Sequence, residues 1–434
     1  MKAVARFIRF AVVGALMAGV MVVPLVVPPL AASAASKPTL YVLGTGFLTY
    51  PALGSAVPPQ TYMTQPPEAV IHAWNSSASS KFKVSYSFCN DYATPTGSAA
   101  CARQAISSTG CAGHVCDVVF DVVDLNDADS IPAISDRGIP IVGMDVNSAA
   151  ALDAKNMYCL TGTLKVVEQG LGGVFKFLGV KKAGVVSYTE QDTSEVQSWI
   201  TSSMAREGVA LSATTVVPDI DTAPGPAIAT VVTSGATGVV LGFGAAGLAP
   251  AIQYTVNTYP GVKMVLPSYS YNGSFVSGIP ISDLVGLGVA AWQQPITAMQ
   301  VPGVKEYWDQ YGHTVSASSG FRYYDNSILA WLGTKFILNV ANTVHGSFSH
   351  SSLLAALHSA NNINMYGIMP PYTSADRGKN GAVACSPYNA DVVETTHLVS
   401  GSGQSTPIQV AAHPGVFNNP VTGKVAYVDP GFKA

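Results

Sequence analysis

The chain has 434 residues, enough for two domains, and 48% of them are hydrophobic, which excludes a disordered chain. Charged residues make up only 11%, and the net charge is −3. No cluster of Lys or Arg follows residue 34. We therefore expect no nucleic-acid partner, because phosphate binding needs a basic surface.

The amino-terminal segment, residues 1–34, has the organisation of a secretory signal. A basic start precedes a long apolar stretch that ends in small residues at Ala34. We expect cleavage near Ala34, which leaves 19 basic and 25 acidic residues and a net charge of −6. An uncleaved membrane anchor is the alternative, because residues 10–30 are long enough to span a bilayer, although prolines interrupt them. Either way, we expect an exported protein, periplasmic or extracellular and associated with the cell envelope.

Six cysteines, an even number in an exported chain, favour disulfides. Short separations favour two of the pairs, and the third follows from what remains: Cys89 with Cys101, Cys111 with Cys116, and Cys159 with Cys385. A zinc site is the alternative, but the sequence has no CxxC and only His114 lies among the cysteines. We expect no metal.

Short β-rich runs alternate with amphipathic stretches from about residue 39. The predicted strands begin near residues 39, 83, 115, 139, 183, 210, 238, 263 and 284, with residues 155–162 as a further candidate. Each repeat has room for a strand, a crossover helix and two loops, which predicts α/β architecture with parallel sheets covered by helices on both faces. One wide sheet or two smaller sheets satisfy this pattern, and we favour two lobes.

Other segments are predicted as helices or as late strands. Short helices are expected within 68–75, 99–107 and 129–138, and longer ones at 301–310, 321–345 and 349–360. The last 60 residues turn to short strands around 393–400, 406–412 and 424–429.

Sequence motifs of common enzymes and cofactor sites are missing. There is no phosphate-binding loop, zinc-protease motif or nucleophile elbow. Glycines at 242, 244 and 247 resemble a dinucleotide-binding turn, but no acidic residue between Asp221 and Asp283 is available for the ribose, so no cofactor is predicted. A Ser/His/Asp triad is defined by geometry alone, which keeps an exported α/β hydrolase as an alternative.

Four stretches carry a resemblance to a known family: 88–91 with 100–105, 136–143, 170–173 with 179–186, and 367–371. Together they resemble the leucine/isoleucine/valine-binding type of periplasmic solute-binding protein, the receptor component of ABC importers. The resemblance implies a non-catalytic, monomeric receptor with two doubly wound parallel-sheet lobes, a ligand cleft and three hinge crossings. Its partners would be a small-molecule solute and the permease subunits.

The resemblance also implies lobe boundaries. Lobe 1 would comprise 35–155 plus 293–375, and lobe 2 would comprise 156–292 plus 376–434. Cys159 and Cys385 would then join two segments near the hinge. A ligand-sensing protein with the same two lobes but no role in transport is a further alternative.

Parallel sheets bind ligands beyond the carboxyl ends of their strands, so the strand-end loops are the candidate site. The predicted ligand-binding residues are Phe47, Tyr50, Asp121, Asp124, Asp145, Val146, Asn147, Tyr188, Ser268, Tyr269 and Tyr271. Two further acids near Asp124, Asp127 and Asp129, fit the first turn of a helix instead.

The resemblance places the family's carboxylate-binding loop on 143–147 and its ammonium-binding acid just after Pro267. This chain carries Asp145 in that loop and Ser268 at the position of the acid. An ordinary branched-chain amino acid is therefore not the expected ligand. Our hypothesis is reversed polarity, in which Asp145 accepts hydrogen bonds from an amine or a hydroxyl-rich solute.

Overall fold

The computed structural model describes most of the chain after the amino-terminal segment. The described residues are 37–49, 61–146, 148–188, 194–218, 223–243, 247–270, 279–296, 298–299, 301–314, 325–379, 382–388, 394–399, 408–411, 417–418 and 425–427. The predicted signal, residues 1–34, lies outside them.

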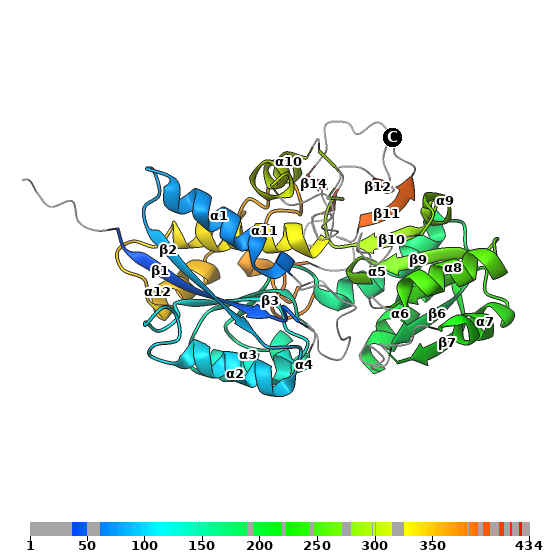
Figure 1. Ribbon diagram of the computed structural model, residues 1–434, viewed down its shortest axis with the longest axis horizontal. Coiled ribbons are helices and arrows are strands. Elements are labelled where there is room, and N and C mark those ends of the chain that lie inside the picture. Colours follow the sequence, from blue (N-terminus) through cyan, green and yellow to red (C-terminus); the bar gives the residue numbers. More distant parts are fainter. Residues whose placement is uncertain are drawn as a thin grey trace, which may run out of the picture. The chain divides into compact units, whose positions relative to one another are not determined.

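The first lobe contains a five-stranded sheet of order β2-β1-β3-β4-β5, and all its strands are parallel (Figure 1). Its strands are β1 (Thr39–Gly46), β2 (Lys83–Asn90), β3 (Val118–Val123), β4 (Ile141–Asp145) and β5 (Met157–Cys159). All six residues of β3 are buried, as expected for a central strand covered on both faces. The sequence prediction of parallel strands is confirmed here.

Helices cover both faces of this sheet, with α1 and α11 on one side and α2 and α3 on the other (Figure 1). The helices of the lobe are α1 (Gln65–Ser76), α2 (Pro95–Ile106), α3 (Asp127–Asp136), α4 (Ala149–Leu152), α10 (Pro302–Tyr307), α11 (Asp325–Ala341) and α12 (His350–His358), with shorter turns η2 (Thr61–Met63), η5 (Trp308–Gly312) and η7 (Ser374–Asp376). Helix α11 packs closely because Gly333 faces Phe120, where a Cβ would lie 2.5 Å from the ring. It is buried over most of its length, which explains its lack of a polar face.

The second lobe contains a seven-stranded sheet of order β12-β11-β10-β9-β8-β6-β7. Its strands are β6 (Lys182–Tyr188), β7 (Ala210–Val217), β8 (Gly238–Gly242), β9 (Lys263–Pro267), β10 (Gly288–Ala291), β11 (Glu394–Val399) and β12 (Ile408–Ala411). The five strands from β6 to β10 are parallel, as predicted, whereas the two late strands are antiparallel additions at the β10 edge. Two short strands, β13 (Phe417–Asn418) and β14 (Val425–Tyr427), form a separate pair.

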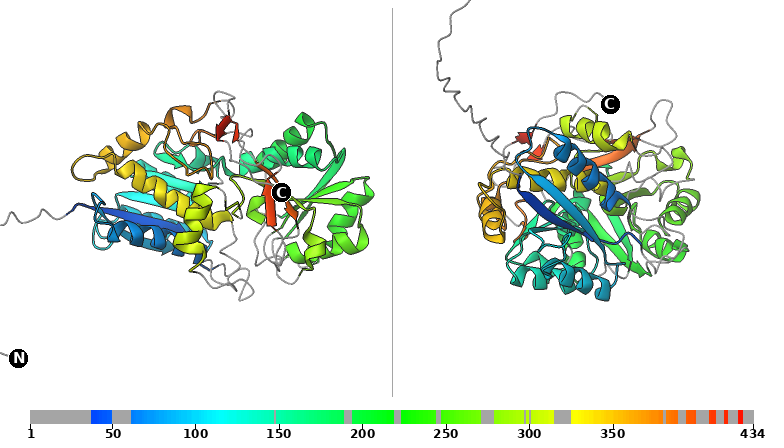
Figure 2. Two further views of the ribbon diagram at one scale, coloured as in Figure 1. Left: turned by 90° about the horizontal axis from the view of Figure 1, so that it is seen from above. Right: turned by 60° about the vertical axis from the view of Figure 1, so that its left-hand side comes forward.

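Helices flank the second sheet as well (Figure 2). They are α5 (Thr163–Phe177), α6 (Ser194–Arg206), α7 (Gly225–Thr233), α8 (Leu248–Thr258) and α9 (Ile281–Leu284), with the turn η4 (Ser268–Ser270) after β9. Helices α5 and α6 meet at Gly172, whose N–H donates to Ser203 Oγ at 2.8 Å. A Cβ at Gly172 would lie 2.3 Å from the Ser203 carbonyl oxygen, so this position of the 170–173 motif requires glycine.

The structure corrects two of the expected lobe boundaries. Residues 156–159 were expected in the second lobe, but β5 pairs with β4 in the first sheet. The segment after 376 was also expected there, yet the Cys159 N–H donates to the Cys385 carbonyl at 2.9 Å. The Tyr388 ring packs against Tyr372, which packs against Phe336 of α11 in the first lobe. Only from β11 onward does the tail join the second sheet. A three-residue edge strand is too short to give an alternating pattern that identifies its sheet.

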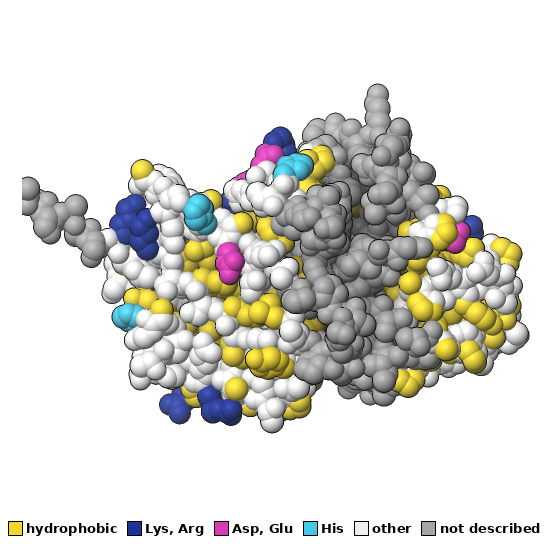
Figure 3. Space-filling view, in the orientation of Figure 1, with side chains coloured by type: hydrophobic (Ala, Val, Ile, Leu, Met, Phe, Trp, Pro, Cys, Tyr) yellow, Lys and Arg dark blue, Asp and Glu magenta, His cyan; other side chains and the backbone are white. Residues whose placement is uncertain are grey.

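Charged side chains are sparse on the face shown in Figure 3, in keeping with their 11% share of the sequence. Among the residues with described placement, no helix combines the length and the apolar character that a membrane crossing needs.

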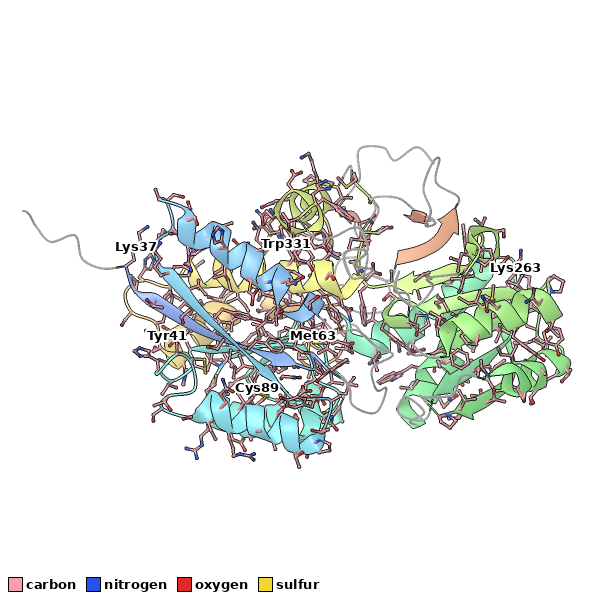
Figure 4. The ribbon with its side chains drawn as sticks, viewed as in Figure 1. Lys37, Tyr41, Met63, Cys89, Lys263 and Trp331 are labelled. Atoms are coloured by element: carbon pink, nitrogen blue, oxygen red, sulfur yellow. A yellow bond between two sulfur atoms is a disulfide. The ribbon has the colours of Figure 1, made fainter. Side chains whose placement is uncertain are left out.

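All three predicted disulfides are present: Cys89–Cys101, Cys111–Cys116 and Cys159–Cys385. The first ties the end of β2 to α2, and Figure 4 labels Cys89 there. The third ties β5 to the segment that precedes β11, and so fixes the tail where it leaves the first lobe.

Replacing Cys159 and Cys385 together by alanine is expected to lower the free energy of unfolding by about 5 kcal/mol, because this disulfide closes the largest loop and restricts the unfolded chain most. The control, Cys111→Ala with Cys116→Ala, opens a loop of sequence separation 5 and is expected to lower it by about 2 kcal/mol. Urea unfolding followed by circular dichroism measures both. Equal losses would contradict the prediction.

Candidate functional site

The predicted site residues that the structure describes lie at the carboxyl ends of parallel strands in both sheets. Those described with their side chains are Phe47, Asp121, Asp124, Asp145, Val146, Ser268 and Tyr269. Tyr188 is described by its backbone at the end of β6, and Tyr50, Asn147 and Tyr271 lie outside the described residues. The three acids lie together in the first lobe, and Ser268 and Tyr269 lie together in the second. Val146 instead packs in an apolar core cluster, and Phe47 packs against another.

The group in the first lobe is a cluster of buried carboxyls: Asp91, Asp121, Asp124, Asp127 and Asp145. Burial, with the neighbouring Asp124 and Asp127, raises the pKa of Asp121 well above its usual value. Burial and then Asp127 raise the pKa of Asp145 to about 7. Burial and then Asp124 raise the pKa of Asp91 to about 7. Ionisation of one acid in this cluster therefore disfavours ionisation of its neighbours. Near neutral pH the cluster carries fewer negative charges than it has carboxyl groups.

Asp124 acts as the organising acceptor of the cluster. Its Oδ2 accepts from Ser98 Oγ at 2.5 Å and Ser130 Oγ at 2.7 Å, and its Oδ1 accepts from the Asn126 N–H at 2.8 Å. These donors come from α2, α3 and the loop between β3 and α3. Asp124 thereby holds two helix starts against the end of β3.

Two further acids of the cluster also accept hydrogen bonds. Asp127, expected in the first turn of a helix, is the first residue of α3 and accepts from the Ser148 N–H at 3.1 Å. Asp121 Oδ1 accepts from Thr45 Oγ1 at 3.2 Å, whereas its Oδ2 is buried without a partner. The charged form of Asp121 is therefore only partly compensated by hydrogen bonds.

A second group surrounds two of the segments that connect the lobes. Tyr269 Oη donates to Glu168 Oε1 at 2.5 Å, and the Tyr269 ring lies 6.4 Å from the Trp292 ring. Trp292 Nε1 donates to the Thr163 carbonyl at 2.8 Å. Thr163 has φ +65°, a left-handed conformation that a β-branched residue adopts at a cost, so the surrounding contacts hold strained backbone in place.

Several buried polar atoms near these strand ends and helix starts have no hydrogen-bond partner within the protein. They belong to Asp121, Thr163, Ser187, Ser268, Ser270, Gln293 and Asp325. Ser187 lies in β6, Ser268 and Ser270 follow β9, and Gln293 follows β10. Such atoms cost free energy unless they find a partner, and their concentration at the strand ends of both lobes suits a site that binds a polar molecule.

Sequence reasoning missed four members of this arrangement: Thr163, Glu168, Gln293 and Asp325. Glu168 and Asp325 do carry a signal in the sequence, because each is an acid set in or directly before a long apolar run. An acid in such a place is either paired or functional. Thr163 and Gln293 have no comparable signal, since their roles depend on where the chain crosses between the sheets.

A metal site is not supported by the part of the chain that is described, because no three His, Cys, Asp or Glu side chains converge there in a way that could hold an ion. The carboxyls of the first lobe are spread over β3, β4 and the loops beside α2 and α3. Their geometry suits hydrogen bonding to hydroxyl and amide groups.

The sequence and the fold were compared with protein families and with solved structures. A family model described as "Periplasmic binding protein" matches residues 80–391. No curated protein matches the chain in sequence. Solved structures similar to this one include a substrate-binding periplasmic protein from Ralstonia solanacearum and a leucine-binding protein from Thermotoga maritima. Both have a TM-score of 0.65 and 13% identity over 86% of this chain, and they are covered over 100% and 99% of their own lengths.

A further similar structure is a solute-binding protein of an ABC transporter from Rhodopseudomonas palustris in complex with 3,4-dihydroxybenzoic acid. It has a TM-score of 0.66 and 12% identity, and the match covers 91% of this chain and 99% of that one. At this identity the likeness shows the fold, and both lobes of parallel α/β structure agree with it.

The buried Glu168 gives a prediction for pH. Burial raises its pKa to about 7, although the bond from Tyr269 lowers it. Between the usual value of 4.5 and 7 the folded protein keeps a proton that the unfolded chain has lost, so the contribution of Glu168 to stability falls as pH rises. Glu168→Gln removes this titration and keeps an acceptor oxygen. The stability of this variant relative to the wild type is therefore expected to rise by about 3 kcal/mol between about pH 4.5 and pH 7.5.

Urea unfolding at a series of pH values measures this difference. Glu207→Gln is the matched control, because Arg206 and Lys176 lower the pKa of Glu207. The contribution of Glu207 to stability therefore changes with pH in the opposite direction. That variant is expected to lose stability relative to the wild type as pH rises. Parallel pH profiles for the wild type and Glu168→Gln would show that Glu168 is not a buried titrating acid.

Proposed function

The chain belongs to the periplasmic binding protein family, and we propose that it is an exported receptor that binds a small polar or amphipathic solute between its two lobes. It releases the solute unchanged to the permease subunits of an ABC importer. The observation that carries this proposal is the set of buried, unpartnered polar atoms at the strand ends of both sheets. A bound solute would supply the hydrogen bonds that these atoms lack.

Lobe closure gives such a receptor its affinity. A solute that contacts Asp121 in the first lobe and Ser268 in the second favours the arrangement in which both reach it at once. Binding at micromolar affinity requires about 8 kcal/mol in total. Several hydrogen bonds, together with the apolar contact area of the Tyr269 ring, would supply this binding free energy.

The revised lobes and the export of the protein belong to the same proposal. We place the first lobe at about 37–160 with 296–388, and the second at 163–291 with 394–411. Cleavage near Ala34 would release a monomer outside the cytoplasm. The positions of β5 and Cys385 support these boundaries.

Three of the described histidines make contacts away from the strand-end serines. His114 stacks on Tyr41, His350 bonds the Cys116 carbonyl, and His358 bonds Tyr158. All three are engaged elsewhere in the first lobe. The unpartnered serines at the strand ends of the second lobe do not form hydrogen bonds with them. A nucleophile needs a base within hydrogen-bond reach, so none of these three histidines is the base of a strand-end serine.

The test is to denature protein purified from its native culture and to identify released small molecules by mass spectrometry. We expect one class of solute, recovered unaltered, that raises the melting temperature when added back. Conversion of that solute by the protein would favour the hydrolase alternative. A neighbouring kinase in place of permease genes would favour sensing.

A substitution tests the site itself. Ser268→Ala removes a buried hydroxyl after β9 and is expected to weaken binding of the recovered solute roughly tenfold in isothermal titration calorimetry. Ser282→Ala is the control, because Ser282 is exposed and bonds only Asp283 among the described residues. Equal affinities of the two variants would place the solute elsewhere.

A further inference from the structure

We propose that the solute carries a positively charged nitrogen and that Asp325, with Gln293 beside it, receives this group. The inference rests on the proposed solute-binding function and names the chemical class of the ligand.

Asp325 and Gln293 form a pair of buried side chains whose polar atoms are all unused. Asp325 is the first residue of α11, and Gln293 lies just after β10. Both side chains have 0% exposure. The two carboxyl oxygens and the amide oxygen and nitrogen are buried without a hydrogen-bond partner. Gln293 lies close enough to lower the pKa of Asp325, although the two side chains are not in hydrogen-bond geometry.

The pair lies next to the other unpartnered groups of the second lobe. Helix α11 and strand β10 both pack against η4, which carries Ser268 and Ser270. The residue before Gln293 is Trp292, which bonds Thr163 and faces Tyr269. Helix α11 and strand β10 thus meet a turn that carries two unpartnered hydroxyl groups, and an aromatic ring directly precedes Gln293.

Among the described residues, no ion pair brings a basic side chain to Asp325. Burial raises the pKa of Asp325 to about 7, which shows how little its charged form is compensated. Glu168 is a second buried acid, held by Tyr269. The ion pairs of the described residues join Lys176 and Arg206 to Glu207, Lys305 to Asp309, Lys335 to Glu306, and Lys379 to Asp376, and none of them includes Asp325 or Glu168.

An ammonium or amidinium group fits this environment. It would bring the missing positive charge to Asp325 and donate to the Gln293 amide oxygen, so the buried carboxylate would gain a partner. A ligand carboxylate in the same place would meet an uncompensated acid. The acid thus comes from the start of α11, whereas the sequence comparison looked for it after β9, where Ser268 stands.

Two matched sets of probes test the charge preference. The first set is tyramine, tyrosol and 4-hydroxyphenylacetate, and the second is 3-methylbutylamine, 3-methylbutan-1-ol and 3-methylbutanoate. Within each set only the end group changes, from ammonium to hydroxyl to carboxylate. Calorimetry of the wild type at pH 7 is expected to show the amine binding at least tenfold more tightly than either analogue in at least one set.

Asp325→Asn keeps the shape of the side chain and removes its charge, and it is expected to lose at least tenfold in amine affinity. Asp309→Asn is the control, because Asp309 is an exposed acid paired with Lys305, and its amine affinity is expected to equal that of the wild type. The wild-type comparison needs no variant, so the inference stays testable even where Asp325→Asn fails to fold.

The outcomes separate the inference from the function on which it rests. Tighter binding of a carboxylate or alcohol probe overturns the charged nitrogen and leaves the receptor intact. Where no probe binds, the solute released from the native protein decides. A solute that contains a basic nitrogen and is no longer retained by Asp325→Asn supports the inference. A solute without a basic nitrogen overturns it. A protein that retains no solute and binds no probe contradicts both proposals.

Discussion

A buried oxygen or nitrogen without a hydrogen-bond partner costs free energy, and the architecture of this protein depends on where such atoms are placed. In both lobes the parallel strands end at one edge, and polar side chains follow the apolar strands there. Asp121 lies near the end of its strand in the first sheet, Ser187 lies near the end of β6 in the second, and Ser268 directly follows β9. A fold that gathers unpartnered groups in this way is stable only because its apolar sheets and helices supply the rest of the free energy.

The connections between the lobes show a second level of organisation. Trp292 at one connection bonds the backbone of Thr163 at another, and its ring faces Tyr269, which in turn bonds Glu168. A strained residue, an aromatic ring and a buried acid are thereby joined in one chain of contacts. Because the same contacts border the candidate site, the backbone that links the lobes and the side chains that would meet a solute are held by one set of interactions.

The sequence predicted the regular elements well because strand and helix periodicity are local. The runs beginning at Thr39, Lys83 and Ala210 became strands that start at those residues. Short disulfide separations were equally informative for Cys111 and Cys116. The sequence failed where a feature depends on distant segments. It assigned 157–159 to the wrong lobe because three residues contain no information about their neighbours, and it passed over Asp325 because an acid before an apolar helix has no visible partner in the sequence.

The buried acids divide into two kinds, and this division explains how a chain with so few charges uses them. Asp124 and Asp127, beside α2 and α3, accept hydrogen bonds from hydroxyl and backbone N–H groups at helix starts, which offset their charge without any basic residue. Asp124 shows this most clearly, since both of its oxygens are occupied. Asp325 also stands at a helix start, but neither of its buried carboxyl oxygens accepts a hydrogen bond from a hydroxyl or backbone N–H group. The first kind stabilises the loops at the end of a sheet, whereas the second remains available to a molecule from outside.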